Sequence, residues 1–488
     1  MFKNLVTFRY AFNEHFSISL VLTLSVILQW LFFLPYYLPS DTVNYLNAND
    51  ILNFRILGET IHIVRLGMVG PTAFLRLFGL HELIVLYGLL TSAGTILITY
   101  RLGLFLGNKT KGLIAAVIVS LTPIHVIFGA PLLPDGPLVF FALLSFYLII
   151  TTVANPAQAK TKFLASGLLL GLAYTCKVTA LFFCVPALGH IFFTSDKQTR
   201  IQSAIIFFSG LAFIFIAEIT ILKFMLNEWH FRIIETLGFI DGTKGNYIEV
   251  DKDIGWWIEQ IRFKIGAFLW AEHLPTALLY LAIPHLYLVS LWKLLPDLKK
   301  QFWVISWGFV WIGQQLVISP IEQDPRYMQA VIPFAAIIIA LGLGSYWDTL
   351  SKSIRNVIIV AFMSCSITSA SIFYSTFLPL ASAINDYSSQ LDLMGGKNNV
   401  IDGASEYEVR LANYFGWTTP LTATYGEQIT HVARLSYGYT KDQDQSFVIP
   451  TNMERIFHSE HISPLKDIFQ FLDINPGVGS KSSISIYH

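Results

Sequence analysis

The chain has 488 residues, of which 54% are hydrophobic and only 13% are charged. So few charged side chains cannot coat a water-soluble protein of this size, which excludes an ordinary soluble enzyme and predicts an integral membrane protein. The 32 basic and 32 acidic residues leave a formal net charge of +0, so we expect no nucleic-acid partner. The partners that the composition predicts are membrane lipids.

Apolar runs long enough to cross about 30 Å of hydrocarbon, roughly 20 residues each, recur along the chain and predict about 11 transmembrane helices. The fifth and sixth runs are short and are separated only by Lys177, so one broken helix is the alternative there. The expected fold class is an all-α polytopic membrane protein. The expected spans lie near residues 16–38, 82–104, 112–130, 136–153, 163–176, 178–194, 201–226, 274–292, 302–318, 329–347 and 354–378.

Basic residues gather in every second connection between these spans, beginning with Lys3 and Arg9 before the first. Short cytoplasmic loops carry the lysine and arginine excess in membrane proteins, so the pattern predicts a cytoplasmic N-terminus. Merging the fifth and sixth spans would put the later basic loops on the wrong side, so both are kept. The first span is longer than a signal-peptide core and lacks a small-residue cleavage site, so we expect it to be retained. The expected location is the inner (plasma) membrane.

Three long segments face outward in this topology, toward a periplasm or an equivalent compartment. Residues 39–81 and 227–273 are outer loops of a transmembrane domain over residues 1–380. The aromatic residues of the second loop are typical of a helix lying in the membrane interface or of an aromatic belt. Residues 381–488 are more polar and predict a small soluble α/β domain. Its expected strands are Val400–Ser405, Leu421–Tyr425 and Ser446–Pro450, and its expected helices are Glu406–Tyr414 and Pro464–Leu472.

Two aspartates lie at outer ends of spans. Asp41 follows the first span, with Tyr45 one helical turn further on, and Asp135 lies between Pro134 and Gly136 at the start of the fourth. Aspartate is a good helix N-cap, so capping is an alternative role for each. Together they favour chemistry, because a hydroxyl or amine acceptor needs a nearby carboxylate to take its proton as it attacks.

Cationic side chains at the same face are candidates to bind a lipid phosphate. Arg326, followed by Tyr327, precedes the tenth span, and its guanidinium can donate two hydrogen bonds to phosphate oxygens. Pairing with a neighbouring acidic residue is the alternative for Arg326. Lys177 lies at the outer hinge between two spans, where a lysine can also extend toward the membrane surface. Arg65 and His62 in the first outer loop are further candidates.

No motif of a soluble enzyme is present: the chain has no Walker loop, no glycine-rich dinucleotide fingerprint and no metalloprotease or serine-hydrolase motif. The Gly167 to Gly171 spacing is more typical of helix packing in a membrane than of a site. Asp41 and Asp135 lie far apart in sequence and no ligand spacing joins them, so no metal site and no cofactor are expected, and a divalent cation is an alternative that no motif supports. The three cysteines, which lie singly in apolar stretches, suggest neither disulfides nor a thiolate site.

Several short motifs, taken in order, resemble the GT-C membrane glycosyltransferases of the protein mannosyltransferase and lipid A aminoarabinose-transferase type. The resemblance covers roughly residues 15–345 and depends on the order and placement of the motifs. They are Ser40-Asp41-Thr42 with Tyr45, Arg-Leu-Gly-Met-Val-Gly-Pro at 65–71, Leu-Phe-Gly at 77–79, Tyr-Arg-Leu-Gly at 100–103, Ala115-Ala116 leading to Leu121-Thr-Pro, Leu-Pro-Asp-Gly-Pro-Leu at 133–138, Gly-Leu-Ala-Tyr-Thr-Cys-Lys at 171–177, and Pro-Arg-Tyr-Met at 325–328 before Ile332-Pro333.

The resemblance implies a transferase that takes a sugar from a polyprenyl-phosphate donor, such as an undecaprenyl-phosphate sugar, to a lipid, glycan or protein acceptor, with inversion. Asp41 matches the family's catalytic carboxylate, the general base, and Asp135 matches an acidic residue that shapes the acceptor site. Arg326 and Lys177 would contact the donor phosphate. Two departures leave the sugar and acceptor open: Thr42 replaces the second acidic residue of the first loop, and a Lys-Pro-Pro turn is missing.

The alternative function is a lipid-linked-sugar flippase or transporter without transferase chemistry. Transport predicts ionisable groups near the middle of the membrane and repeated, broken helices. Glu218 inside the seventh span fits in part, but a buried carboxyl that is hydrogen-bonded to a neighbouring helix is the favoured interpretation. The acidic groups of the predicted site lie at span ends, which favours the transferase.

Overall fold

The structure is a computed structural model, and the chain divides into two units that are described separately. The first unit comprises Met1–Leu31 and Tyr45–Ile367, and the second comprises Phe32–Asn44 and Thr368–His488. The residues that the structure describes are 2–32, 65–80, 84–131, 133–154, 156–226, 229, 288–290, 292, 302–306, 308–310, 329–391, 399–402, 431–437, 455–462 and 481–487.

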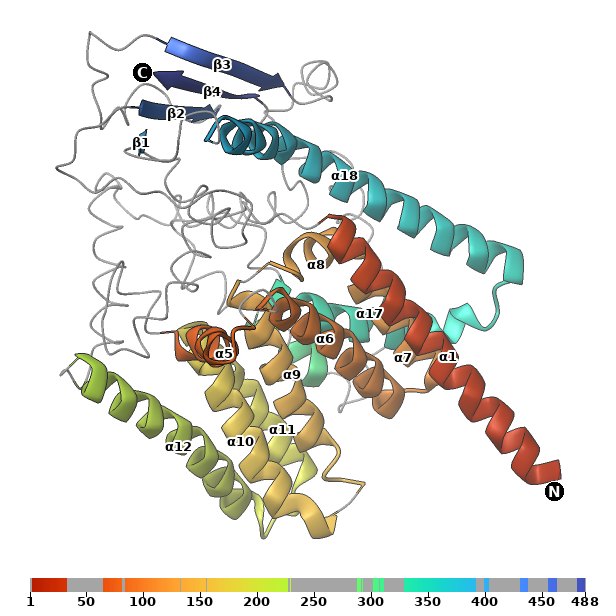
Figure 1. The fold of residues 1–488 in the computed structure, drawn as a ribbon. Coiled ribbons are helices and arrows are strands. Elements are labelled where there is room, and N and C mark those ends of the chain that lie inside the picture. The colour runs from red at the N-terminus through yellow and green to blue at the C-terminus, as the bar shows by residue number, and fades with distance from the viewer. Residues whose placement is uncertain are drawn as a thin grey trace, which may run out of the picture. The chain divides into compact units, whose positions relative to one another are not determined.

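The first unit is a bundle of helices, in which α6, α9, α10 and α11 run close together (Figure 1). Helix α12 packs along α10, and α7 packs between α6 and α17. The helices are α1 (Phe2–Leu31), α5 (Leu66–Leu77), α6 (Ile84–Leu106), α7 (Lys109–Leu121), α8 (Pro123–Phe128), α9 (Asp135–Ile150), η2 (Pro156–Gln158), α10 (Ala159–Cys176), η3 (Val178–Phe183), α11 (Cys184–Thr194), α12 (Arg200–Leu226), α17 (Ile332–Trp347) and α18 (Lys352–Leu391), of which α18 continues into the second unit.

Membrane-spanning character is present in this bundle. Among the described residues, three helices are long and apolar enough to cross a membrane: Leu86–Leu106, Arg200–Phe224 and Lys352–Ser371. Shorter apolar helices include Asp135–Ile150 and Val178–Thr194. The helical, membrane-embedded class is therefore confirmed. The expected spans over 274–292 and 302–318 lie largely outside the described residues, so the count of 11 stays a prediction.

The third expected span, over 112–130, is not one helix. Helix α7 ends at Leu121 and α8 begins at Pro123, with Thr122 in an extended conformation between them. The physical reason is Pro123, which has no N–H to donate to the preceding turn and whose ring clashes with it. The Thr122 N–H reaches the carbonyls of Ile118 at 3.0 Å and Val119 at 3.3 Å, and the Thr122 hydroxyl donates to the Ile118 carbonyl at 2.6 Å, so these last carbonyls of α7 have donors at the break.

Helix α5 lies inside the segment that the sequence predicts as an outer loop. It begins directly after Arg65 and contains Pro71 without ending there. Met68, Val69 and Ala73 are almost fully buried, at 0%, 1% and 5% exposure. These apolar side chains give the segment one buried face, which is the property that makes a short helix stable in a folded protein.

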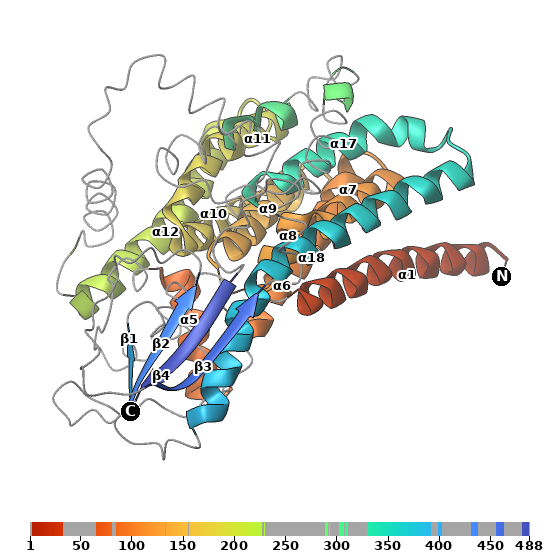
Figure 2. The same ribbon diagram turned by 90° about the horizontal axis from the view of Figure 1, so that it is seen from above.

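The glycines of the Gly167 to Gly171 pair are packing contacts, as the sequence suggests. Helices α10 and α12 lie side by side (Figure 2). A Cβ at Gly167 would collide with the carbonyl of Phe207, and one at Gly171 would lie 2.6 Å from the Cβ of Ile214. The two backbones approach this closely only because both positions are glycine.

Gly167→Ala is expected to lower the free energy of unfolding by about 1–3 kcal/mol, because the new methyl group pushes α12 away from α10. Thermal unfolding of the purified protein in detergent measures the effect. Gly70→Ala is the matched control, since a Cβ there meets nothing within 4 Å. The control should be neutral or slightly stabilising. Equal melting temperatures for the two variants would contradict the close packing.

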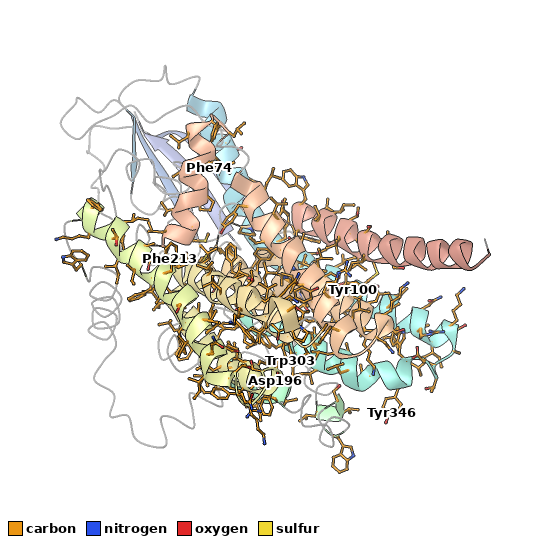
Figure 3. The ribbon with its side chains drawn as sticks, turned by 90° about the horizontal axis from the view of Figure 1, so that it is seen from below. Phe74, Tyr100, Asp196, Phe213, Trp303 and Tyr346 are labelled. Atoms are coloured by element: carbon orange, nitrogen blue, oxygen red, sulfur yellow. The ribbon has the colours of Figure 1, made fainter. Side chains whose placement is uncertain are left out.

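The core of the bundle is aromatic. The ring of Phe146 lies 5.4 Å from that of Phe334, 6.1 Å from Trp303 and 5.5 Å from His190, between ring centroids. Trp303 lies among the dense side chains of the bundle, whereas Phe213 lies on α12 and is 65% exposed (Figure 3). Helix α12 therefore presents apolar side chains outward, as a lipid-facing helix does.

The second unit contains a four-stranded sheet with the order β1-β2-β4-β3 (Figure 2). Strand β1 pairs with β2 in parallel, and β4 pairs antiparallel with both β2 and β3. Strand β1 overlaps the expected strand Val400–Ser405, whereas the other three strands are not predicted from the sequence. The other expected strands and both expected helices of residues 381–488 lie outside the described residues. The strands are β1 (Asn399–Asp402), β2 (His431–Tyr437), β3 (Arg455–Ile462) and β4 (Lys481–Tyr487).

Helix α18 is longer than the span expected over 354–378. It has 40 residues, from Lys352 to Leu391, and therefore extends for about 60 Å. That is roughly twice the thickness of the hydrocarbon layer. The predicted domain boundary between residues 380 and 381 lies within this helix. At this boundary the sequence becomes more polar, but the helix continues.

Candidate functional site

Two of the residues predicted for the site, Asp135 and Lys177, form a buried ion pair. Asp135 is the first residue of α9, and Lys177 directly follows the last residue of α10. These consecutive, packed helices bring the start of one to the end of the other. The Nζ of Lys177 donates to Oδ1 of Asp135 at 2.8 Å, and the two side chains are only 11% and 3% exposed.

Asp135 does not cap its helix. The N-cap residue of α9 is Pro134, and no side chain caps this end by a hydrogen bond. The capping interpretation is therefore wrong for Asp135, whose Oδ1 accepts from Lys177. The carboxylate still gains from its place in the first turn, where the helix dipole favours a negative charge.

Lys177 is positioned by a change of helix type. Its backbone is extended, with φ −155° and ψ 133°, between α10 and η3. Its N–H still donates to the Ala173 carbonyl at 3.1 Å, so the residue closes α10. With a buried side chain directed at Asp135, Lys177 does not extend to the membrane surface, and that interpretation of the sequence is wrong.

The start of α5 packs on the same end of α10. A Cβ at Gly67 would lie 2.5 Å from Oγ1 of Thr175 and 2.6 Å from Sγ of Cys176. The hydroxyl of Tyr87 in α6 donates to the Gly67 carbonyl at 2.9 Å. Arg65, a predicted phosphate ligand, precedes Gly67 by two residues, and its carbonyl accepts the first N–H bonds of α5. The segments that carry Arg65 and Lys177 are thus in contact.

Gln329 lies beside the first turn of α9 and is not predicted by the sequence analysis. Its side chain is 3% exposed, and its Nε2 donates to the Phe128 carbonyl of α8 at 3.3 Å. A Cβ at Gly136, the residue after Asp135, would lie 3.9 Å from that Nε2 and 3.9 Å from Oγ1 of Thr91. Gln329 follows Arg326 by three residues, so its place near the predicted phosphate ligand was the available signal.

Two of the unsatisfied buried oxygens belong to Asp135 and to Gln329, whose amide lies beside the residue after Asp135. Among the described residues, Oδ2 of Asp135, Oε1 of Gln329 and Oγ1 of Thr179 are buried and have no hydrogen-bond partner. A buried acceptor without a donor costs about 1–3 kcal/mol, so native proteins keep few of them. Of the three, the Asp135 and Gln329 oxygens can only accept, so a group that satisfies them must donate hydrogen bonds.

A second buried polar group ties three helices together. Nε2 of Gln29 in α1 donates to Oγ of Ser92 at 2.7 Å and to Oγ of Ser25 at 3.1 Å. Oγ of Ser92 in α6 lies 2.7 Å from Nε2 of His125 in α8. Such side-chain bonds fix helices to one another where apolar contacts alone give no direction. These bonds fix the position of α8, and the Phe128 carbonyl in the last turn of α8 accepts a hydrogen bond from Gln329.

Glu218 is buried in α12 at 2% exposure, as expected for a carboxyl packed against its neighbours. Within the described part of the chain, no cluster of three or more histidine, cysteine, aspartate or glutamate side chains could hold a metal ion. The predicted site residues that lie outside the described residues are Asp41, Tyr45, His62, Arg326 and Tyr327.

Residues 72–223 match the family described as dolichyl-phosphate-mannose-protein mannosyltransferase. These residues include Asp135 and Lys177, together with helices α6 to α11. No curated protein matches the chain.

The fold is similar to that of the archaeal oligosaccharyltransferase AglB from Archaeoglobus fulgidus. A structure of that enzyme with an inhibitory peptide and a dolichol-phosphate has a TM-score of 0.51 and 10% identity, over 87% of this chain and 70% of that chain. A structure of the Archaeoglobus fulgidus oligosaccharyltransferase with zinc and sulfate has a TM-score of 0.51 and 12% identity, over 85% of this chain and 67% of that chain. At such identities the likeness shows the fold.

Proposed function

We propose that this chain is a GT-C-type membrane glycosyltransferase that transfers a sugar from a polyprenyl-phosphate donor to a lipid, glycan or protein acceptor, a proposal that its family match and its fold support. The observation that carries the proposal is the match over residues 72–223 to a family named for a lipid-phosphate sugar donor. The buried Asp135–Lys177 pair within those residues supplies charged groups at a helix end, where such a site needs them.

The proposed reaction is an inverting displacement. An acceptor oxygen or nitrogen attacks the anomeric carbon and forms the new glycosidic bond. The bond from that carbon to the phosphate oxygen breaks, and the electron pair leaves with the polyprenyl phosphate. The acceptor's proton passes to the carboxylate of Asp41, the proposed general base. Asp41 follows the first expected span, and the resemblance of its surrounding motif, Ser40-Asp41-Thr42, implies the catalytic carboxylate at this position.

The proposed binding groups divide by charge. Arg326 with Tyr327, together with Arg65 and His62, would hold the donor phosphate and stabilise the charge that develops as it leaves. Lys177 joins them through its ammonium. The ammonium donates to Oδ1 of Asp135 at 2.8 Å, which holds it at the end of α10 where the phosphate is proposed to bind.

Substrate positioning is assigned to two further residues. Asp135 positions donor or acceptor, and Tyr45 belongs to the substrate loop after the first span. The proposed location is the inner (plasma) membrane, with the N-terminus in the cytoplasm and residues 381–488 on the outer side, where the acceptor is met. The alternation of basic loops along the sequence supports this orientation.

Membranes that contain the protein are expected to move label from a polyprenyl-phosphate sugar into a lipid, glycan or protein fraction. The assay supplies radiolabelled polyprenyl-phosphate mannose, glucose or galactose to membrane extracts and identifies the product that gains label. Membranes without the protein are the control. Donor lipid that crosses sealed vesicles without any labelled product would instead support the flippase alternative and contradict the transferase proposal.

A further inference from the structure

Two unpartnered acceptor oxygens lie beside the ion pair, on different elements. One is Oδ2 of Asp135 at the start of α9, and the other is Oε1 of Gln329 just before α17. The Gln329 amide lies next to Gly136, so it is close to the residue that follows Asp135. Both residues are at least nine-tenths buried, at 2% and 3% exposure. Such a pair of oxygens can be satisfied only by a group that donates hydrogen bonds.

The orientation of the Gln329 amide follows from its contact with α8. Nε2 faces the Phe128 carbonyl at 3.3 Å. Only the NH2 end of an amide can donate there, because an oxygen in its place would face another acceptor. Oε1 must therefore be directed away from α8, and its role as an acceptor is set by the fold.

The chemistry of these atoms excludes phosphate as their ligand. A phosphate group offers acceptor oxygens and a negative charge, so it would repel both the Asp135 carboxylate and the Gln329 carbonyl oxygen. A sugar differs because each hydroxyl carries a hydrogen that it can donate. Of the two parts of a polyprenyl-phosphate sugar, the sugar is the one that fits Oδ2 and Oε1.

We propose that Asp135 and Gln329 form a two-acceptor site for hydroxyl groups of the transferred sugar, and that Gln329 is a specificity-determining residue. This rests on the proposed function, which supplies a donor with both a sugar and a phosphate. Lys177 holds Asp135 in place at 2.8 Å and marks the border between the sugar and the phosphate groups. A site of this kind selects sugars by which hydroxyls they carry, because a missing hydroxyl leaves a buried acceptor unpaired.

The test compares two lipids on the full-length protein in detergent: polyprenyl phosphate, and the polyprenyl-phosphate sugar (mannose, glucose or galactose) that donates in the transfer assay. Wild-type protein should bind the sugar-bearing lipid more tightly. Gln329→Leu should weaken its binding by about tenfold, the usual cost of a lost hydrogen bond at a buried group, and leave polyprenyl phosphate within about twofold. Retained binding of polyprenyl phosphate also shows that the variant is folded.

Thr91→Val is the matched control. Oγ1 of Thr91 is as far from a Cβ at Gly136 as the Gln329 amide is, but it donates within its own helix to the Tyr87 and Gly88 carbonyls at 2.9 and 3.0 Å. Valine has the same shape, so binding of both lipids should be unchanged. Equal weakening of both lipids by Gln329→Leu, or no weakening of either, would overturn the inference and leave the proposed function standing. If wild-type protein neither binds nor uses any of the sugar lipids, the proposed function itself fails.

Discussion

Lys177→Met is expected to lower the free energy of unfolding by about 3–5 kcal/mol, because it leaves the Asp135 carboxylate buried without its cation. Methionine keeps an unbranched side chain of similar length, so the loss of stability reflects the missing charge more than a change in side-chain volume. The Asp135 side chain is only 3% exposed, which prevents water from replacing the lysine. Unfolding of the purified protein in detergent, followed by tryptophan fluorescence, measures the change.

A double variant separates the ion pair from simple damage. Asp135→Leu combined with Lys177→Met removes both charges and should recover most of the lost stability. Lys160→Met is the matched control, since Lys160 is an exposed lysine on the same helix, α10. Its free energy of unfolding should change by less than about 0.5 kcal/mol. A double variant that is no more stable than Lys177→Met alone would show that the pair does not act as a unit.

Asp41→Asn is expected to reduce the rate of sugar transfer by about 10²–10⁴-fold and to leave expression and membrane insertion intact. Asparagine cannot take the acceptor's proton, yet it caps a helix as well as aspartate does. The substitution therefore removes a base and preserves a cap. The initial rate of label transfer in membranes, normalised to the amount of protein, measures the effect.

Asp50→Asn serves as the control for the same predicted outer loop, since it removes one acidic charge nearby and should transfer at the wild-type rate. Transfer by Asp41→Asn at the wild-type rate would assign Asp41 to capping and require another base. A comparable loss in both variants would indicate that the charge of the loop, and not one carboxylate, is needed.

The ends of helices were the most predictable part of the site. Hydropathy ends one apolar run near Cys176 and starts another near Asp135, so Asp135 and Lys177 are expected at the outer face from the sequence alone. The structure adds that they bond to each other. Sequence reasoning could not supply this contact, because it depends on how α9 and α10 turn about their axes when they pack.

Gln329 shows why other parts of the site could not be predicted. Its partner, the Phe128 carbonyl, is 201 residues away in sequence, and no local pattern connects the two. The break at Pro123 is different, since the proline is visible in the sequence. The mean hydropathy of an apolar run does not reveal this helix break, because one proline changes the backbone far more than it changes the hydropathy of the segment.

The sheet of the second unit was difficult to predict for another reason. Strand β3 has the sequence Arg-Ile-Phe-His-Ser-Glu-His-Ile, and β4 has Lys-Ser-Ser-Ile-Ser-Ile-Tyr. Polar and charged residues outnumber large apolar ones in both, so an apolar run does not mark them. Only in β4 do polar and apolar residues alternate clearly, and only over a few residues. The neighbouring strands β2 and β3 are recognised by their pairing with β4 in the sheet and not by an alternating sequence.

The break between α7 and α8 also has a consequence for how the protein is made. Carbonyl groups at a helix end need donors, and in hydrocarbon an unmet carbonyl costs several kcal/mol. The carbonyl of Leu121, the last residue of α7, receives its bond from the hydroxyl of Ser366, 245 residues later. A ribosome adding about 5–20 residues per second needs about 12–50 s to reach that serine. During this time the Leu121 carbonyl lacks this donor, so the end of α7 is completed only when α18 has been made.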